Sequence, residues 1–138
     1  MIKDIVKDET ILTQKSEQVN FEDAQHIIVD LLDTANEHID HCAGLAAPQI
    51  GVNKRVVVIR NGDTFHPMIN PVIIKKSGKR FINSEGCLSL DGIRSVERST
   101  SVLVSYIDKS GKRLTKTFNG MPAIIIQHEV DHLNGILI

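Results

Sequence analysis

Residues 122–133 read Pro-Ala-Ile-Ile-Ile-Gln-His-Glu-Val-Asp-His-Leu, and this stretch decides how the rest of the chain is arranged. Proline suits the first turn of a helix, and Asn134-Gly135 is a typical helix end. At helical spacing, His128 and His132 share one side with several apolar residues, and the opposite side is apolar too. A helix that is apolar on both sides is buried. We therefore predict a central helix with the other elements packed around it.

His128-Glu129-Val130-Asp131-His132 is a His-Glu-x-x-His sequence, which places two imidazoles one helical turn apart with a carboxylate between them. Two core histidines satisfied by hydrogen bonds are the simpler alternative. Burying two histidines and two acids is costly, however, unless they are paired or bind a metal. The pattern favours a divalent metal, with Asp131 or Gln127 as partner of the imidazoles, or with an ion pair from this helix to Arg98.

A catalytic metal site usually has three protein ligands and one open position. Cys87, in the turn-like segment Ser84-Glu-Gly-Cys-Leu-Ser89, is the natural third ligand because a thiolate binds metals strongly. Cys42 is the alternative, and spacing alone does not exclude it.

A second helix is predicted from residue 21 to residue 40. Asn20 is a typical N-cap with an acid three residues later, and apolar residues recur at 21, 24, 28, 31, 35 and 39. The acidic residues face outward, so this helix buries one face only. We interpret His26, His38 and His41 as surface or capping residues.

Small residues and strand-like runs fill the region between the helices. Residues 43–52, Ala-Gly-Leu-Ala-Ala-Pro-Gln-Ile-Gly-Val, nearly lack long side chains, so the backbone approaches something closely here. The turn signals Lys76-Ser-Gly-Lys79 and Asp108-Lys-Ser-Gly111 predict antiparallel hairpins, and the basic cluster at 75–80 would be a solvated hairpin tip. Strands are predicted at 55–60, 65–69, 71–76, 93–98, 100–107 and 112–118. The fold class is α+β, with antiparallel sheets around the buried helix.

Length and charge exclude several classes of protein. The 138 residues fit a single domain, 1–138. Lys plus Arg number 16 against 17 for Asp plus Glu, so no basic field attracts nucleic acid or an anionic membrane. No apolar run approaches the roughly 20 residues of a membrane-spanning helix, and the start lacks a signal-peptide pattern. Two cysteines without an export signal predict free thiols and a cytoplasmic location.

Three segments resemble, in order and spacing, the signature motifs of peptide deformylases. They are Gly44-Leu-Ala-Ala-Pro-Gln49, Glu85-Gly-Cys-Leu-Ser89 and Gln127-His-Glu-Val-Asp-His-Leu133. Residues 68–71 are similar to the family's strand before the second motif. The resemblance covers residues 42–135 and implies a peptide deformylase-like fold. It also implies a metal-dependent hydrolase that removes the N-formyl group from the N-terminal formylmethionine of peptides or nascent chains and releases formate.

The resemblance implies a role for each motif residue. Cys87, His128 and His132 would hold one divalent metal, natively Fe(II), which Zn(II), Ni(II) or Co(II) can replace. Glu129 would be the general base, while the Gln49 side chain and the Leu88 backbone N–H would stabilise the oxyanion. The substrate peptide would pair with the backbone at Ala43 and Gly44 as an added strand. Its methionine side chain would enter a pocket lined by Met121, Ile124 and Ile125.

The sequence departs from the family pattern in three places. The first motif usually begins Gly-x-Gly and here reads Cys42-Ala-Gly44, and residues 90–92 read Leu-Asp-Gly where the family commonly has Ile or Val followed by Pro. The sequence stops at Ile138, so it resembles the short deformylase-like form that lacks the C-terminal helix. Because that helix is implicated in ribosome docking in the family, docking is left open.

Two rival functions follow from these residues. The altered first motif and the short end keep open a metal-bound, non-catalytic module that binds formylated or N-terminal peptides. An endoprotease of the zincin type would need a third ligand after His132, and no His, Cys, Asp or Glu follows it.

Overall fold

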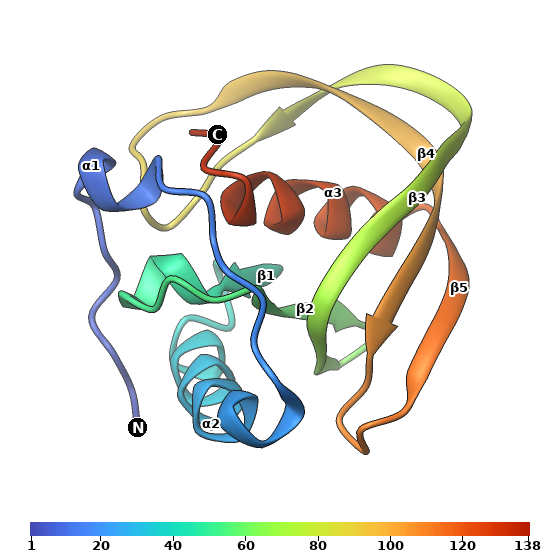
Figure 1. Cartoon of the computed structure of the whole chain (residues 1–138). Coiled ribbons are helices and arrows are strands. Elements are labelled where there is room, and N and C mark those ends of the chain that lie inside the picture. Colours follow the sequence, from blue (N-terminus) through green and yellow to red (C-terminus); the bar gives the residue numbers. More distant parts are fainter.

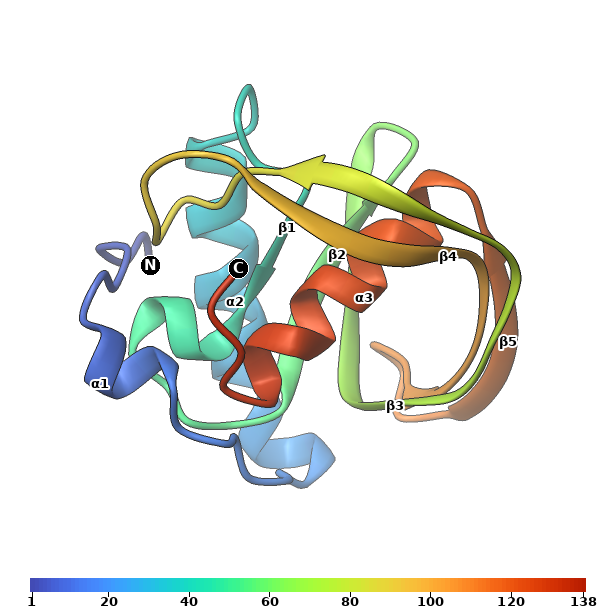
Figure 2. The same ribbon diagram turned by 90° about the horizontal axis from the view of Figure 1, so that it is seen from above.

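Helix α3, Met121–Leu133, runs through the middle of the molecule, and a curved sheet wraps around it (Figure 1). The computed structural model describes all residues from 1 to 138. The sheet has five strands in the order β1-β2-β3-β4-β5, and every neighbouring pair is antiparallel. Helix α2, Phe21–Glu37, lies on the side of β1 and β2 away from α3 (Figure 2). The predicted α+β fold class is confirmed.

The strands differ strongly in length. They are β1 Gly44–Ala46, β2 Val56–Asn61, β3 Thr64–Glu85, β4 Arg94–Ile107 and β5 Arg113–Asn119. Short helices at Glu9–Leu12 (α1) and Ala47–Ile50 (a 3-10 helix) complete the fold. None of the helices has the length and apolar character needed to span a bilayer.

The prediction of six short strands was wrong in the middle of the chain. The runs at 65–69 and 71–76 are parts of β3, and those at 93–98 and 100–107 are parts of β4. The turn predicted at Lys76–Lys79 is absent, because β3 continues through it as a bulge opposite β4. Gly78 has a φ of 75°, and the Lys79 N–H donates to the Thr100 hydroxyl at 2.9 Å, which replaces the lost ladder bond. The basic cluster at 75–80 therefore lies on a bulged strand.

The core consists of two layers that share strand β2. Val56 and Val58 pack in the cluster that faces α2, while Val57 and Ile59 pack in the cluster that faces α3. Successive side chains of a strand point to opposite faces of the sheet. A continuous apolar run is therefore what a strand buried on both faces requires, and β2 has one.

Both long helices begin or end as their sequence signals predict. The Asn20 side chain accepts from the Asp23 N–H at 2.8 Å, which caps α2. Helix α2 ends at Glu37, three residues before the predicted end, and His38 is its C-cap, as interpreted from the sequence. Helix α3 is followed by Gly135 with a φ of 74°.

Asn70 attaches the N-terminal segment to the sheet. It is 9% exposed and has a φ of 51°, which is uncommon for a residue other than glycine. Its side chain accepts from the Val19 N–H at 3.0 Å and donates to the Val19 carbonyl at 2.7 Å. The amide therefore acts on Val19 as a neighbouring strand would.

We expect Asn70→Ala to lower the free energy of unfolding by about 2–4 kcal/mol. The substitution removes two buried hydrogen bonds, and alanine has no polar side chain to stabilise the positive φ of this position. Asn70→Gly removes the same hydrogen bonds but tolerates the backbone conformation, so it should be less destabilising. Urea unfolding of the three proteins measures both effects. Equal stability of all three would show that the Val19 contacts contribute nothing.

Candidate functional site

A cavity of about 270 Å³ lies between β1, the loop after β3 and helix α3. Almost all of the residues singled out from the sequence line it: Ala43, Gly44, Gln49, Cys87, Leu88, Met121, Ile124, Ile125, His128 and Glu129. His132 is 1% exposed and contacts His128 on the side away from the cavity opening. Segments that are far apart in the sequence therefore meet in one place.

Three donor atoms of Cys87, His128 and His132 converge at the base of this cavity. The Cys87 sulfur lies 3.4 Å from His132 Nε2, which lies 3.1 Å from His128 Nε2. All three donor atoms lie within 4.8 Å of one another. The edges of a tetrahedral site with ordinary metal–ligand bonds are about 3.3 Å between two nitrogens and about 3.5 Å between nitrogen and sulfur. The three residues therefore fit a single metal ion.

The two imidazoles accommodate one positive charge. Burial alone would lower the pKa of His128, but its contacts with Cys87 and Glu85 outweigh burial and raise the pKa to about 10. Burial and the charge of His128 lower the pKa of His132 to about 3. Two imidazolium charges at this separation would repel each other. A single cation held between the two ring nitrogens avoids this repulsion.

The alternative ligand Cys42 is not part of this cluster. Its thiol donates to the Gly44 carbonyl at 3.2 Å. Burial, together with the charge of Glu129, raises the pKa of Cys42 to about 12, so it stays a thiol. The structure thus favours Cys87, and both cysteines are free, as predicted.

Sequence reasoning missed the partner of His128, which is Glu85. Glu85 Oε1 lies 2.7 Å from His128 Nδ1, and Arg98 binds both oxygens of the same carboxylate at 2.7 and 2.8 Å. Burial opposes ionisation of Glu85, but hydrogen bonds from Arg98, His128 and Asn83 outweigh it and lower the pKa. An ionised Glu85 accepts from Nδ1–H, so Nε2 is the His128 nitrogen that faces the cluster, and a metal that displaces its proton would meet the Nε2 lone pair. The feature of the sequence that could have identified Glu85 is an acidic residue two positions before the predicted ligand Cys87.

The partners proposed for the imidazoles from the sequence were partly wrong. Gln127 binds neither histidine, because its side chain is taken up by the backbone N–H and carbonyl of Ser99 at 3.0 and 2.8 Å. Asp131 accepts from Arg98 at 2.6 Å, so the predicted ion pair is confirmed. Arg98, which is 3% exposed, therefore joins β3, β4 and α3.

Glu129 points into the cavity beside the cluster. It is 3% exposed, and its Oε1 atom has no hydrogen-bond partner. Burial raises the pKa of Glu129 to about 7, against the opposing charge of His128. A carboxylate with a pKa near 7 is suited to accept and return a proton at neutral pH.

Gly44 makes room for Glu129. A Cβ at this position would lie 2.7 Å from Glu129 Oε2 and 2.8 Å from the Ile125 side chain. The close approach predicted from the small residues of this segment is therefore real, and the group approached is the carboxylate.

Two hydrogen-bond donors lie near Cys87. Gln49 Oε1 accepts from the Ala46 N–H at 3.0 Å, which aims the amide nitrogen at Cys87 Sγ and Ser89 Oγ, 3.3 and 3.2 Å away. The backbone N–H of Leu88 makes no hydrogen bond within the chain. Gln49 and Leu88 both line the cavity.

The remaining walls suit an extended peptide. Strand β1 is at the edge of the sheet and pairs with β2 only, so the outer edge beside Ala43 and Gly44 is open. Met121 is exposed and Ile124 is half-buried, while Ile125 is 6% exposed. These three side chains form an apolar wall one to two helical turns before His128.

Comparison with known proteins points to one family. The family model described as polypeptide deformylase matches residues 2–138. A protein from Clostridium beijerinckii named peptide deformylase is 48% identical over 138 residues, which is all of both chains. Another from Pelotomaculum thermopropionicum with the same name is 47% identical over 113 residues, 80% of this chain and 72% of that one.

Solved structures agree with this assignment. The class I type b peptide deformylase from Acinetobacter baumannii with bound actinonin has a TM-score of 0.89 and 34% identity, covering 99% of this chain and 95% of that chain. Another structure of that enzyme holds Met-Ala-Ser, with a TM-score of 0.88, 32% identity, and coverage of 99% and 97%.

We expect Arg98→Met to lower the free energy of unfolding by about 3–5 kcal/mol, because it leaves the buried Glu85 carboxylate without its cation. The matched control is Arg80→Met, whose ion pair with Glu97 is exposed on both sides and should change stability by about 0.5 kcal/mol or less. Denaturant unfolding measures both variants. A loss below about 1 kcal/mol in Arg98→Met would mean that Glu85 finds other compensation.

Proposed function

The chain belongs to the peptide deformylase family, and we propose that the cavity around Cys87, His128 and His132 is its active site. The protein is a hydrolase that removes the N-formyl group from N-terminal formylmethionine of peptides and releases formate. The observation that supports this site is the meeting of three metal-binding donors with Glu129 and Gln49 in one cavity.

The three donors would hold one divalent metal ion. A metal bound here would polarise the formyl oxygen and lower the pKa of a bound water from 15.7 towards about 7. A thiolate with two imidazoles accepts several first-row metals. We propose Fe(II) as the native ion, with Zn(II), Ni(II) or Co(II) as functional replacements.

Glu129 would move the proton. It is not one of the three donors, it lines the same cavity, and its Oε1 atom has no hydrogen-bond partner. It would accept a proton from the attacking water and deliver it to the amine that leaves. Its burial beside Gly44 keeps bulk water from competing for this proton.

Gln49 and Leu88 would stabilise the oxyanion that forms at the formyl carbon. The Gln49 amide is oriented before substrate arrives by its bond to the Ala46 N–H, and the Leu88 N–H has no backbone partner to give up. Donors held in position in this way need no reorganisation during the reaction.

The substrate would bind as an added strand along β1. Its backbone would pair with Ala43 and Gly44, and the methionine side chain would contact Met121, Ile124 and Ile125. Backbone pairing accepts any sequence after the methionine. The substrates we propose are therefore formylmethionyl peptides and nascent chains, in the cytoplasm, with the whole chain acting as one domain and binding neither nucleic acid nor membrane.

We expect protein purified anaerobically with Fe(II) or Co(II) to release formate from formyl-Met-Ala-Ser. Glu129→Ala should lower kcat/KM by about 10²- to 10⁴-fold, because the general base is lost. Its metal content should equal that of the wild type, since the three donors are unchanged. Full turnover by this variant would contradict the mechanism.

The same assay distinguishes the enzyme from the rival function, a non-catalytic module that binds formylated peptides. That reading rests on Cys42, which lines the cavity where the family motif has glycine. Metal-loaded wild-type protein that binds formyl-Met-Ala-Ser without releasing formate would select the module.

Gln49→Glu tests the oxyanion donor with little change in shape. The new carboxylate can still accept from the Ala46 N–H but has no N–H to donate. We expect kcat to fall by about 10²- to 10³-fold with a smaller change in KM. Steady-state kinetics on metal-matched samples measures this split, and an unchanged kcat would remove Gln49 from the oxyanion site.

A further inference from the structure

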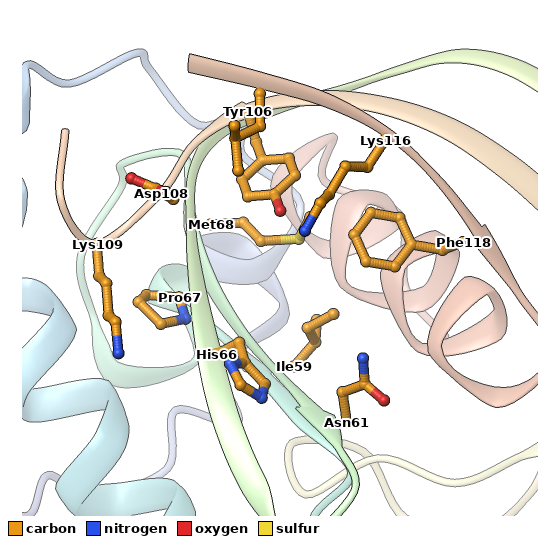
Figure 3. Close-up of a pocket in the computed structure, with 11 residues that line it drawn as sticks. Ile59, Asn61, His66, Pro67, Met68, Tyr106, Asp108, Lys109, Lys116 and Phe118 are labelled. Carbon is orange, nitrogen blue, oxygen red and sulfur yellow. The ribbon is translucent and has the colours of Figure 1, made fainter. Parts of the chain in front are cut away.

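A second cavity, of about 260 Å³, lies on the inner face of the sheet and shares no lining residue with the first. Its walls come from β2, β3, β4, β5 and the turn between β4 and β5 (Figure 3). Ile59, Met68 and Phe118 form an apolar floor. Nothing in the proposed reaction uses it.

Tyr106 presents an unpaired polar group to this cavity. The residue is 7% exposed, and its ring packs against Phe118 with 6.1 Å between centroids. Its hydroxyl makes no hydrogen bond within the chain, and Figure 3 shows it pointing into the space above Met68. Burial and the nearby Asp108 charge raise the pKa of Tyr106, so the hydroxyl remains a donor at neutral pH. The ring is buried while the hydroxyl keeps accessible surface at the cavity, so it is free to donate to a group that enters from solvent.

Lys116 brings a positive charge to the same place. Alternation along β5 puts it on the inner face between Leu114 and Phe118, and it pairs across the sheet with Val104. It has no carboxylate partner. Figure 3 shows its ammonium group directed into the same space as the Tyr106 hydroxyl.

The other charged groups of the cavity do not cancel this one. Lys109, also on the wall, has no ion-pair partner. The only acid is Asp108, whose Oδ1 accepts from the Ser110 N–H and hydroxyl and from the Lys112 N–H within its own turn. His66 Nε2 lies 3.0 Å from the Thr64 hydroxyl. The cavity therefore combines an apolar floor with donors and net positive charge.

We propose that this cavity is a second binding site, for a small organic anion with a carboxylate on a compact apolar body. The carboxylate accepts from the Tyr106 hydroxyl and pairs with Lys116, while the apolar body contacts Met68 and Phe118. The cavity is smaller than the roughly 300–1,000 Å³ of sites for drug-sized ligands, which fits a ligand of this size. The carboxylate is either a free acid or the end of a peptide.

The chain offers a direct reporter of binding. Tyr106 is the one tyrosine, and there is no tryptophan, so the tyrosine emission of the wild type comes from this cavity. The probe is cyclohexanecarboxylate, which does not absorb where tyrosine is excited, with cyclohexanecarboxamide as its neutral counterpart. We expect a saturable change in emission with a Kd of about 1 mM or below for the acid, and binding at least about tenfold weaker for the amide.

Lys116 has a simpler explanation, in which its stem covers apolar surface and its ammonium group only reaches solvent. Variants distinguish this explanation from a ligand-binding role. Lys116→Met keeps the apolar stem and the tyrosine reporter, and should weaken binding of the acid at least about tenfold. Lys79→Met, on the β3 bulge, should bind as the wild type does. Tyr106→Phe should keep the unfolding midpoint, because its hydroxyl has no partner to lose, and should weaken binding measured by amide shifts of β5 in NMR spectra.

Formate release is measured in the same samples to locate the bound acid. Unchanged release at saturating acid is expected, because the two cavities share no residue. Inhibition in parallel with binding would place the acid at the Cys87 cluster and overturn the proposal. So would absence of a saturable signal, equal binding of acid and amide, or wild-type affinity in Lys116→Met. N-acetylleucine represents the carboxylate end of a peptide. Its affinity relative to that of cyclohexanecarboxylate shows which source of carboxylate is preferred.

Discussion

The guanidinium of Arg98 joins the two elements that carry the three metal-binding donors of the proposed active site. Its bonds to Glu85 and Asp131 join the end of β3 to helix α3 across β4. Cys87 lies two residues after Glu85, so the loop that carries the thiol is held where β3 ends. The same carboxylate orients His128. A charge buried this deeply is tolerable only when both of its partners are present, which makes the site and the fold interdependent.

Close packing around Glu129 imposes a second constraint. The carboxylate needs a dry environment for its raised pKa, and it obtains this by lying against the backbone of β1. Only a residue without a Cβ fits at Gly44. The strand that would receive the peptide and the group that would move the proton are therefore in contact, and a shift of one displaces the other.

Features set by local spacing could be predicted from the sequence, and features set by distant partners could not. The i, i+4 spacing of His128 and His132 and the Asn20 cap need only one helix each. Two similar turn signals behaved differently for a non-local reason. The Asp108 carboxylate closes its turn by accepting three local hydrogen bonds, whereas Gly78 lies opposite β4, which continues the ladder past it. The role of Glu85 likewise depends on Arg98 and His128, which are distant in sequence.

The difference in length between α3 and the sheet accounts for the second cavity. A helix of 13 residues is about 20 Å long, while a strand of 22 residues such as β3 extends for about 70 Å along its curved path. One helix therefore cannot cover the inner face of the sheet. Ile59, Met68 and Tyr106 belong to the core that α3 covers, yet they also border the second cavity. The apolar face thus continues past the end of the helix, and Lys116 provides a charge where that face meets solvent.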